Sequence, residues 1–170
     1  MQIIKQLPLS PGINVADIGS GPGRFSIPIA QLVKPGKVYA IDVDEESLSL
    51  LSSEAARLGV DNIEVIRADV TKGVPLPDSS IDLALMANVF HDFVHEGSAS
   101  KVLSETLRVL KPEGLLAIVE FKKDVTLFGP PPWLRLSPDE VISVLSSNGF
   151  KLKDGPTGAS GTHYILIFSK

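Results

Sequence analysis

Three glycines stand within five residues in the stretch VADIGSGPGRFS, which runs from Val15 to Ser26. Residues without a β-carbon adopt positive φ readily and allow a ligand to lie against the main chain. The glycines therefore indicate either a nucleotide-like ligand or an ordinary glycine-rich turn, and by themselves they do not separate the two. A dinucleotide fingerprint starting at Gly19 would need glycine where the chain has Arg24, and no Walker lysine follows, so the stretch disfavours a pyrophosphate ligand.

Acidic residues follow the glycines at spacings that suit a nucleoside. Asp42 comes 19 residues after Gly23, where α/β nucleotide sites keep a carboxylate that accepts hydrogen bonds from both ribose hydroxyls. Asp44 is the rival acid, but its place before two glutamates favours a helix cap. Asp69, in VIRADV, could accept a hydrogen bond from the exocyclic amine of a base, although a turn-forming aspartate is the simpler account of this residue alone.

Three further side chains are candidates for moving a proton. His91 and Asp92 come just after the strand-like run that ends at Ala87, and Glu120 lies near the end of the next run. A histidine changes charge close to neutral pH, which suits it to general-base work. The alternative is that His91 packs between neighbouring phenylalanines while Asp92 caps the following turn.

The composition of the chain excludes several classes of function. The chain has 170 residues, which predicts one domain with one site, and its 44% apolar and 21% charged residues are typical of a folded globular protein. The absence of cysteine excludes a protein thiolate nucleophile, and the scattered His91, His95 and His163 do not suggest a metal site. A net charge of −4 without a basic stripe disfavours nucleic acid as a partner. No apolar stretch predicts membrane insertion and no signal peptide is visible, so we expect a cytoplasmic protein.

The elements that must position these residues alternate between strands and helices. Nearly continuous apolar runs, typical of buried parallel strands, occur at 14–18, 37–43, 62–67, 81–87 and 115–121. One amphipathic helix is expected after a cap at Asp44 and is ended by Gly59, and another runs from about Ser98 to Leu110 before Pro112 and Gly114 stop it.

A third helix is marked by SPDEVISVLSSNGF, in which Ser137 and Glu140 have capping-box spacing. Two strand-like runs at 150–154 and 162–169 follow it and are joined by turn-rich residues, which predicts an antiparallel hairpin. The whole pattern predicts an α/β doubly wound sheet with the hairpin at its edge. Ligands of such sheets bind beyond the carboxyl ends of the strands, where the glycines and acids fall.

These residues resemble the class I S-adenosylmethionine-dependent methyltransferases in order over nearly the whole chain. VADIGSGPG is similar to their first motif, AIDVD to the segment with their ribose acid, RADV to that with their adenine acid, and LRVLKPEGLLAIVE to the entry into their fifth strand. In detail the chain is nearest to the branch of ubiquinone and menaquinone biosynthesis methyltransferases. The resemblance implies a Rossmann-like fold, a seven-stranded, mostly parallel sheet of order 3-2-1-4-5-7-6 with the last strand antiparallel, and S-adenosylmethionine as cofactor, with no metal.

The resemblance also implies a set of cofactor-binding residues at the strand ends. They are Asp17 and Gly19 facing the methionine part, Gly21 allowing close passage of the main chain, Asp42 on the ribose, Val43 on the adenine face, Ala68 and Asp69 at the adenine edge, and Ala87 and Asn88 near the sulfonium. His91, Asp92 and Glu120 are the candidate catalytic residues.

The expected function is transfer of a methyl group to a small-molecule acceptor by one methyltransferase domain, residues 1–170, with a minimal N-terminal extension. The fourth strand ends in MANV and lacks the N/D-P-P-Y/F motif of enzymes that methylate amino groups of nucleic-acid bases. A noncatalytic cofactor-binding partner of another methyltransferase and a nicotinamide-dependent oxidoreductase are the alternatives. The sequence leaves open whether the protein forms a homo-oligomer.

The segment from Phe121 to Ser137 is a candidate cover for the acceptor, because it should emerge on the ligand side of the sheet. It combines a stiff proline run with Trp133, and its basic residues Lys122, Lys123 and Arg135 would suit an anionic acceptor. The alternative is that its apolar side chains pack as core under the third helix.

Overall fold

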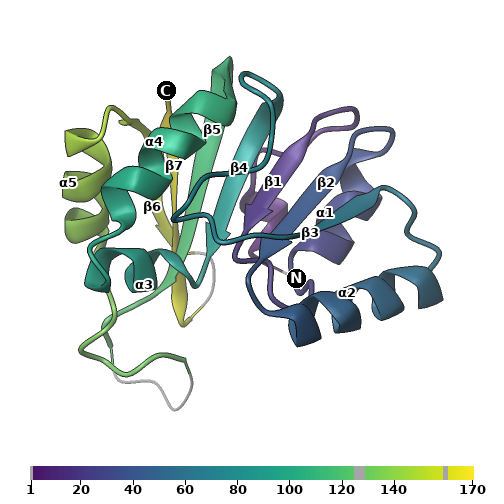
Figure 1. Ribbon diagram of the computed structural model, residues 1–170. Helices are drawn as coiled ribbons and strands as arrows, with labels where there is room; N and C mark the ends of the chain where they lie inside the picture. The colour runs from purple at the N-terminus through teal and green to yellow at the C-terminus, as the bar shows by residue number, and fades with distance from the viewer. Residues whose placement is uncertain (1, 125–128, 159–160) are drawn as a thin grey trace.

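The computed structural model describes residues 2–124, 129–158 and 161–170 (Figure 1). Within these residues, seven strands form one sheet in the order β3-β2-β1-β4-β5-β7-β6. β1 to β5 pair in parallel where they are neighbours, whereas β7 is antiparallel to both β5 and β6. The expected strand order and the antiparallel last strand are therefore confirmed.

The strand bounds agree with the apolar runs except at two places. The strands are β1 (Val15–Ile18), β2 (Val38–Asp42), β3 (Ile63–Arg67), β4 (Ile81–Ala87), β5 (Leu110–Phe121), β6 (Lys151–Gly158) and β7 (His163–Ser169). β5 begins earlier than expected because Leu110 pairs with Ile81, and the residues between Leu110 and Leu115 then bulge out of the ladder. β6 continues into residues that were expected to form the hairpin turn.

Two of the helices begin at the caps that the sequence predicts. The helices are η1 (Ile4–Gln6), α1 (Ser26–Val33), α2 (Glu45–Arg57), α3 (Phe90–His95), α4 (Ala99–Val109) and α5 (Pro138–Ser147). Asp44 accepts a hydrogen bond from the backbone N–H of Ser47 at the start of α2, and Ser137 and Glu140 form a capping box at the start of α5. Both predicted caps are confirmed, whereas α3 was not predicted.

The core lies in two layers, one on each face of the sheet. Side chains of η1, α1 and α2 pack on one face, and side chains of α3, α4 and α5 pack on the other. Covering both faces explains why the central strands are apolar without alternation. Among the described helices, none has the length and hydrophobicity needed to cross a membrane.

Candidate functional site

Buried polar side chains gather at one edge of this sheet. They are Asp17, Ser20, Ser26, His91, Glu120, Arg135 and His163, and they lie at or just beyond the carboxyl ends of β1, β4 and β5 or on segments next to those ends. This is the lower edge in Figure 1, where the loop after β5 also lies. Since burying polar groups costs free energy unless they are satisfied, their concentration at one edge marks a functional region.

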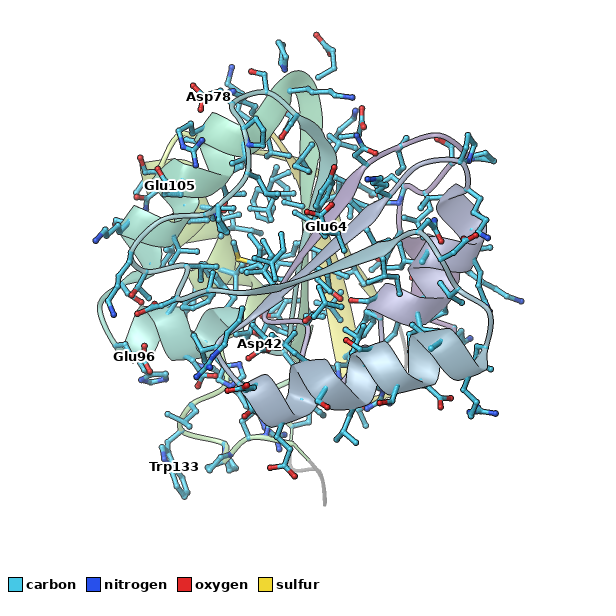
Figure 2. All side chains as sticks on the ribbon, turned by 45° about the vertical axis from the view of Figure 1, so that its right-hand side comes forward. Asp42, Glu64, Asp78, Glu96, Glu105 and Trp133 are labelled. Carbon is cyan, nitrogen blue, oxygen red and sulfur yellow. The ribbon has the colours of Figure 1, made fainter. Side chains whose placement is uncertain are left out.

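A pocket of about 220 Å³ opens at this edge between the ends of β1, β2 and β3 and helix α3. Its lining brings together six residues that the sequence placed at the site, namely Gly19, Asp42, Val43, Ala68, Asp69 and Asp92. Figure 2 shows Asp42 and Glu96 near the same lower edge, and both residues line the pocket. The carboxyl ends of neighbouring parallel strands meet at one edge, which is why residues far apart in the chain converge here.

The Asp42 carboxylate is held by the loops on both sides of it. The backbone N–H of Gly21 donates to its Oδ2 at 2.7 Å, and the backbone N–H of Asp44 donates to its Oδ1 at 2.9 Å. A carboxylate offers about four lone-pair positions, so two of them remain for a ligand. The structure therefore presents a fixed carboxylate with room for two more donors, whereas the side chain of Asp44 is used as the helix cap.

The glycine-rich turn needs its glycines for two reasons. Gly19 and Gly21 have φ values of +75° and +51°, which residues with a β-carbon rarely adopt. A β-carbon added to Gly19 would also lie 2.7 Å from Cγ2 of Val89, while none of the described atoms lies within 4 Å of one added to Gly21. The turn therefore keeps Gly19 close to the segment after β4 and leaves the space beside Gly21 open.

Asp69 forms the expected turn and also lines the pocket. Its Oδ1 accepts hydrogen bonds from the backbone N–H and the hydroxyl of Thr71, as expected of a turn-forming aspartate. Its side chain also pairs with Lys72 at 3.1 Å and lines the pocket. The hydrogen bonds from Thr71 and Lys72 hold the pKa of Asp69 below its usual value, so its carboxylate is ionised at neutral pH and paired with Lys72.

Asp17 is buried near the end of β1, and only one of its two carboxylate oxygens accepts a hydrogen bond within the residues that the structure describes. The Ser26 hydroxyl donates to its Oδ2 at 2.6 Å, whereas its buried Oδ1 has no hydrogen-bond partner in the described part of the chain. Burial raises the pKa of Asp17 from 3.8 to about 6, against the hydrogen bond from Ser26 and with support from the charge of Asp42. A cationic group that reached Oδ1 would relieve this cost.

We expect Asp17→Asn to stabilise the protein at pH 7.5 and not at pH 4. An unfolded-state pKa of 3.8 and a folded-state pKa of about 6 mean that stability is lost as pH rises through 6, by up to about 3 kcal/mol. Asparagine has no carboxyl group to ionise, so the gain in stability should grow between about pH 4 and pH 6 and be complete above pH 6. Urea unfolding of both proteins at the two pH values measures it. If Asp17→Asn lowered the free energy of unfolding equally at pH 4 and pH 7.5, the Asp17 carboxylate would not be destabilised by its burial.

His91 and Glu120 form a buried pair. Nδ1 of His91 lies 3.1 and 2.9 Å from the two carboxylate oxygens of Glu120, and the backbone N–H of His91 donates to Oε1 at 3.1 Å. Because a carboxylate accepts hydrogen bonds, Nδ1 carries a proton toward Glu120, and Nε2 is the ring nitrogen that gains or loses a proton when His91 changes its charge. Nε2 lies 3.5 Å from Oδ1 of Asp92, a half-exposed side chain that lines the pocket.

The charges around His91 favour its protonated form. Burial lowers the pKa of His91, but the hydrogen bond and charge of Glu120, together with the charge of Asp92, outweigh it and raise this pKa above 6.5. The three candidate catalytic residues are thus in one chain of contacts, from buried Glu120 through His91 to Asp92 at the pocket. Phe90 and Phe93 are buried as well, so His91 also packs as its structural alternative expected.

Several predicted residues lie along the same edge but do not line the pocket. They are Asp17, Gly21, Ala87, Asn88, His91 and Glu120. Asn88 has a φ of +58°, and its buried Oδ1 is without a hydrogen-bond partner among the described residues. Both features are costly, and they mark the end of β4 as a strained position next to the site.

One side of the pocket is formed by α3 and the residues at its two ends, which the sequence did not predict. Val89, Phe93 and Glu96 line the pocket together with Asp92. The spacing of Val89 to Phe93 and of Asp92 to Glu96 is that of one helical face, which could have indicated the wall. The helix has six residues, too few for a periodic pattern to stand out.

Comparisons with known proteins show the family to which the chain belongs. A family model described as a methyltransferase domain matches residues 9–151. An uncharacterized methyltransferase-like protein of Schizosaccharomyces pombe is 33% identical over 146 residues, which cover 86% of this chain and 48% of that protein. The ubiquinone/menaquinone biosynthesis C-methyltransferase UbiE of Pseudomonas fluorescens is 35% identical over 114 residues, 66% of this chain and 43% of that one.

A solved structure extends the comparison to nearly the whole fold. The crystal structure of a SAM-dependent methyltransferase from Aquifex aeolicus has a TM-score of 0.88 and 32% identity, and the match covers 98% of this chain and 87% of that chain. The chain therefore belongs to the class I S-adenosylmethionine-dependent methyltransferases. It spans about half the length of the curated relatives it matches. None of these comparisons supports a nicotinamide-dependent oxidoreductase or a noncatalytic partner.

S-adenosylmethionine is the cofactor of this class, and the residues present fit it. Asp42 keeps two acceptor positions that suit a pair of ribose hydroxyls. Ile41, Val43 and Val89 provide apolar wall in the pocket beside it. The unpartnered Oδ1 of Asp17 suits a positively charged group.

Proposed function

We propose that this chain transfers a methyl group from S-adenosylmethionine to a small-molecule acceptor. The observation that carries the proposal is the Asp42 carboxylate. Two backbone N–H groups hold it in place, and it keeps two acceptor positions in the pocket at the carboxyl edge of a methyltransferase sheet. The printed name of one relative, a ubiquinone/menaquinone biosynthesis C-methyltransferase, supports a small organic acceptor. We propose further that residues 1–170 act as one catalytic domain in the cytoplasm.

In this proposal, residues that line the pocket and residues beside it along the same edge each contact one part of the cofactor. Asp42 binds the ribose, Val43 packs on the adenine, and Ala68 and Asp69 read the adenine edge. Asp17 and Gly19 face the methionine part, Gly21 allows its close passage, and Ala87 and Asn88 line the region of the sulfonium. The convergence of Gly19, Asp42, Val43, Ala68 and Asp69 on one pocket supports this division.

The cofactor supplies an activated methyl group, because a sulfonium loses its positive charge on transfer. The chain then has to align donor and acceptor and exclude water. The buried end of β4 beside Asn88 and the glycine turn provide rigid backbone for the alignment.

A proton must also leave an acceptor that reacts through a hydroxyl or a weakly acidic carbon. We propose that Asp92 faces the acceptor and that the proton is held at Nε2 of His91, whose ring Glu120 orients through Nδ1. An acceptor that is already ionised needs no such base. The raised pKa of His91 strengthens it as a base and requires that it be deprotonated before each turnover.

Transfer of label from methyl-labelled S-adenosylmethionine tests the proposed function. The protein is incubated with the labelled cofactor and an extract of the source cells, and small-molecule, protein and RNA fractions are separated. We expect label in the small-molecule fraction only, and none with Asp42→Ala. Label in the RNA or protein fraction would contradict the acceptor class, and its absence from all fractions would contradict the activity.

The predicted acceptor cover at 121–137 stays a prediction. Residues 125–128 lie outside the described part of the chain, but Trp133 is 77% exposed, so the alternative of Trp133 as core is wrong. Arg135 is buried and donates to the backbone carbonyls of Lys122, Asp124 and Pro130, which fixes the base of the loop. Arg135 therefore stabilises the loop, and Lys123 forms an ion pair with Glu140 at 2.6 Å. Two of the three basic residues expected to face an anionic acceptor thus already have partners within the chain.

If the loop covers the acceptor, the fluorescence of Trp133 should shift to shorter wavelength when the acceptor is added. The chain has one tryptophan, so the signal is specific to this loop. The cofactor alone should cause little change, because Trp133 does not line its pocket. Emission that is unaffected by saturating acceptor would exclude closure of the loop.

A further inference from the structure

A second, larger cavity lies behind the glycine-rich turn. It has a volume of about 440 Å³ and is enclosed by the N-terminal segment, the start of α1 and one side of α2. A smaller cavity of about 180 Å³ continues it and shares Ile4, Pro28 and Gln31 with it. None of the residues lining the candidate cofactor pocket lines either cavity. We refer to the two cavities together as the α1 groove.

The walls of the α1 groove are mainly apolar. Ile3, Ile4, Phe25, Ile27, Pro28 and Leu58 line the larger cavity, and Leu32 lines the smaller one. Leu32 and Leu58 are 50% and 43% exposed, whereas Ile29 of α1 and Leu51 of α2 are fully buried. Volume and lining are in the range of small-molecule sites.

The charge of the α1 groove is opposite to that of the whole protein. Arg24 lines the larger cavity and Lys5 the smaller, and in the described structure neither side chain forms a hydrogen bond or an ion pair. Glu54 is the acid in the lining, but Arg57 binds both of its oxygens at 2.7 and 2.6 Å. The hydrogen bonds and charge of Arg57 also keep the pKa of Glu54 low. The groove is therefore positive in a chain of net charge −4.

We infer that the α1 groove binds a small amphipathic acid, with its apolar body between α1 and the N-terminal segment and its anionic group at Arg24. Arg24 suits this role because a guanidinium is charged at all physiological pH values and can bind a carboxylate through two N–H groups. A neutral apolar ligand would leave Arg24 and Lys5 without a counter-charge. This site is separate from the proposed cofactor pocket, although both are bounded by the turn that contains Gly19 and Arg24.

Calorimetric titration with octanoate and with 1-octanol tests the inference. Both have the same apolar chain, so the difference between them reports the anionic group. We expect saturable binding of one octanoate per chain and at least threefold weaker binding of octanol. Arg24→Gln should weaken octanoate at least threefold and leave octanol unchanged. Gln31→Glu places a negative charge on an exposed residue between the two cavities and should weaken octanoate similarly.

Lys101→Gln is the matched control, since it removes one positive charge from the exposed surface of α4, away from the groove. It should bind octanoate as the unchanged protein does. Absence of saturable binding, equal affinity for octanoate and octanol, or equal effects of Arg24→Gln and Lys101→Gln would overturn the inference. A dimer in light scattering that Gln31→Glu dissociates would overturn it too, because a second copy would then occupy the groove. Titration with S-adenosylhomocysteine tests the proposed function separately, since octanoate binding does not depend on methyl transfer.

Discussion

Asp42→Ala is expected to weaken the binding of S-adenosylmethionine and S-adenosylhomocysteine at least tenfold. The variant would remove the two charge-assisted hydrogen bonds that we propose Asp42 makes to the ribose, each worth roughly 1.5–3 kcal/mol, and a tenfold change needs about 1.4 kcal/mol. It also leaves the backbone N–H groups of Gly21 and Asp44 without the carboxylate that now fixes them. The glycine turn should then lose part of its order, which adds to the loss of affinity.

Asp44→Ala is the matched control for this prediction. It removes a carboxylate two residues away whose side chain caps α2 through the N–H of Ser47. We expect a lower melting temperature and an affinity within about twofold of the unchanged protein. Calorimetry of both variants, with circular dichroism to show that they are folded, separates the two roles. If Asp44→Ala alone lost the cofactor, the ribose acid would be Asp44.

The second large effect is expected at His91. Once an acceptor that loses a proton is known, His91→Gln should lower kcat by roughly 10² to 10⁴, the usual contribution of general-base catalysis. Glutamine keeps a side-chain N–H donor toward Glu120, which is fully buried and, of its described hydrogen bonds, would otherwise keep only the one from the backbone N–H of residue 91. Cofactor affinity should change little, because His91 does not line the pocket.

The pH profile distinguishes a base from a packing residue. Since His91 must be deprotonated, kcat/KM should rise with pH through its pKa, which lies above 6.5. Glu120→Gln removes the main group that raises this pKa, so the rise should move to lower pH and the rate at high pH should fall. Asp92→Asn should lower kcat as well. If His91→Gln and Asp92→Asn retain full turnover, the acceptor needs no base from this group and His91 serves only packing.

The sequence by itself determined the order of elements and the residues at each strand end. Continuous apolar runs require burial on both faces, and glycine, proline and capping residues act over a few neighbours. These are local signals, so the alternation of strands and helices, the caps at Asp44 and Ser137 and the placement of Gly19, Asp42 and Asp69 at strand ends could be predicted without coordinates, whereas the strand order was implied by the resemblance to a methyltransferase family. The resemblance to a methyltransferase family then supplied the cofactor.

Only the tertiary structure decided which of these residues meet. The distance from Nδ1 of His91 to Glu120 depends on the pairing of β4 with β5, and the wall that α3 gives to the pocket depends on a helix too short to show periodicity. The start of β5 at Leu110 was decided in the same way, because pairing with Ile81 outweighs the local signals of Pro112 and Gly114. The α1 groove has no local signal at all, since its lining comes from three segments that fold together. Contacts of this kind depend on long-range packing, which overrides local propensity wherever the two conflict.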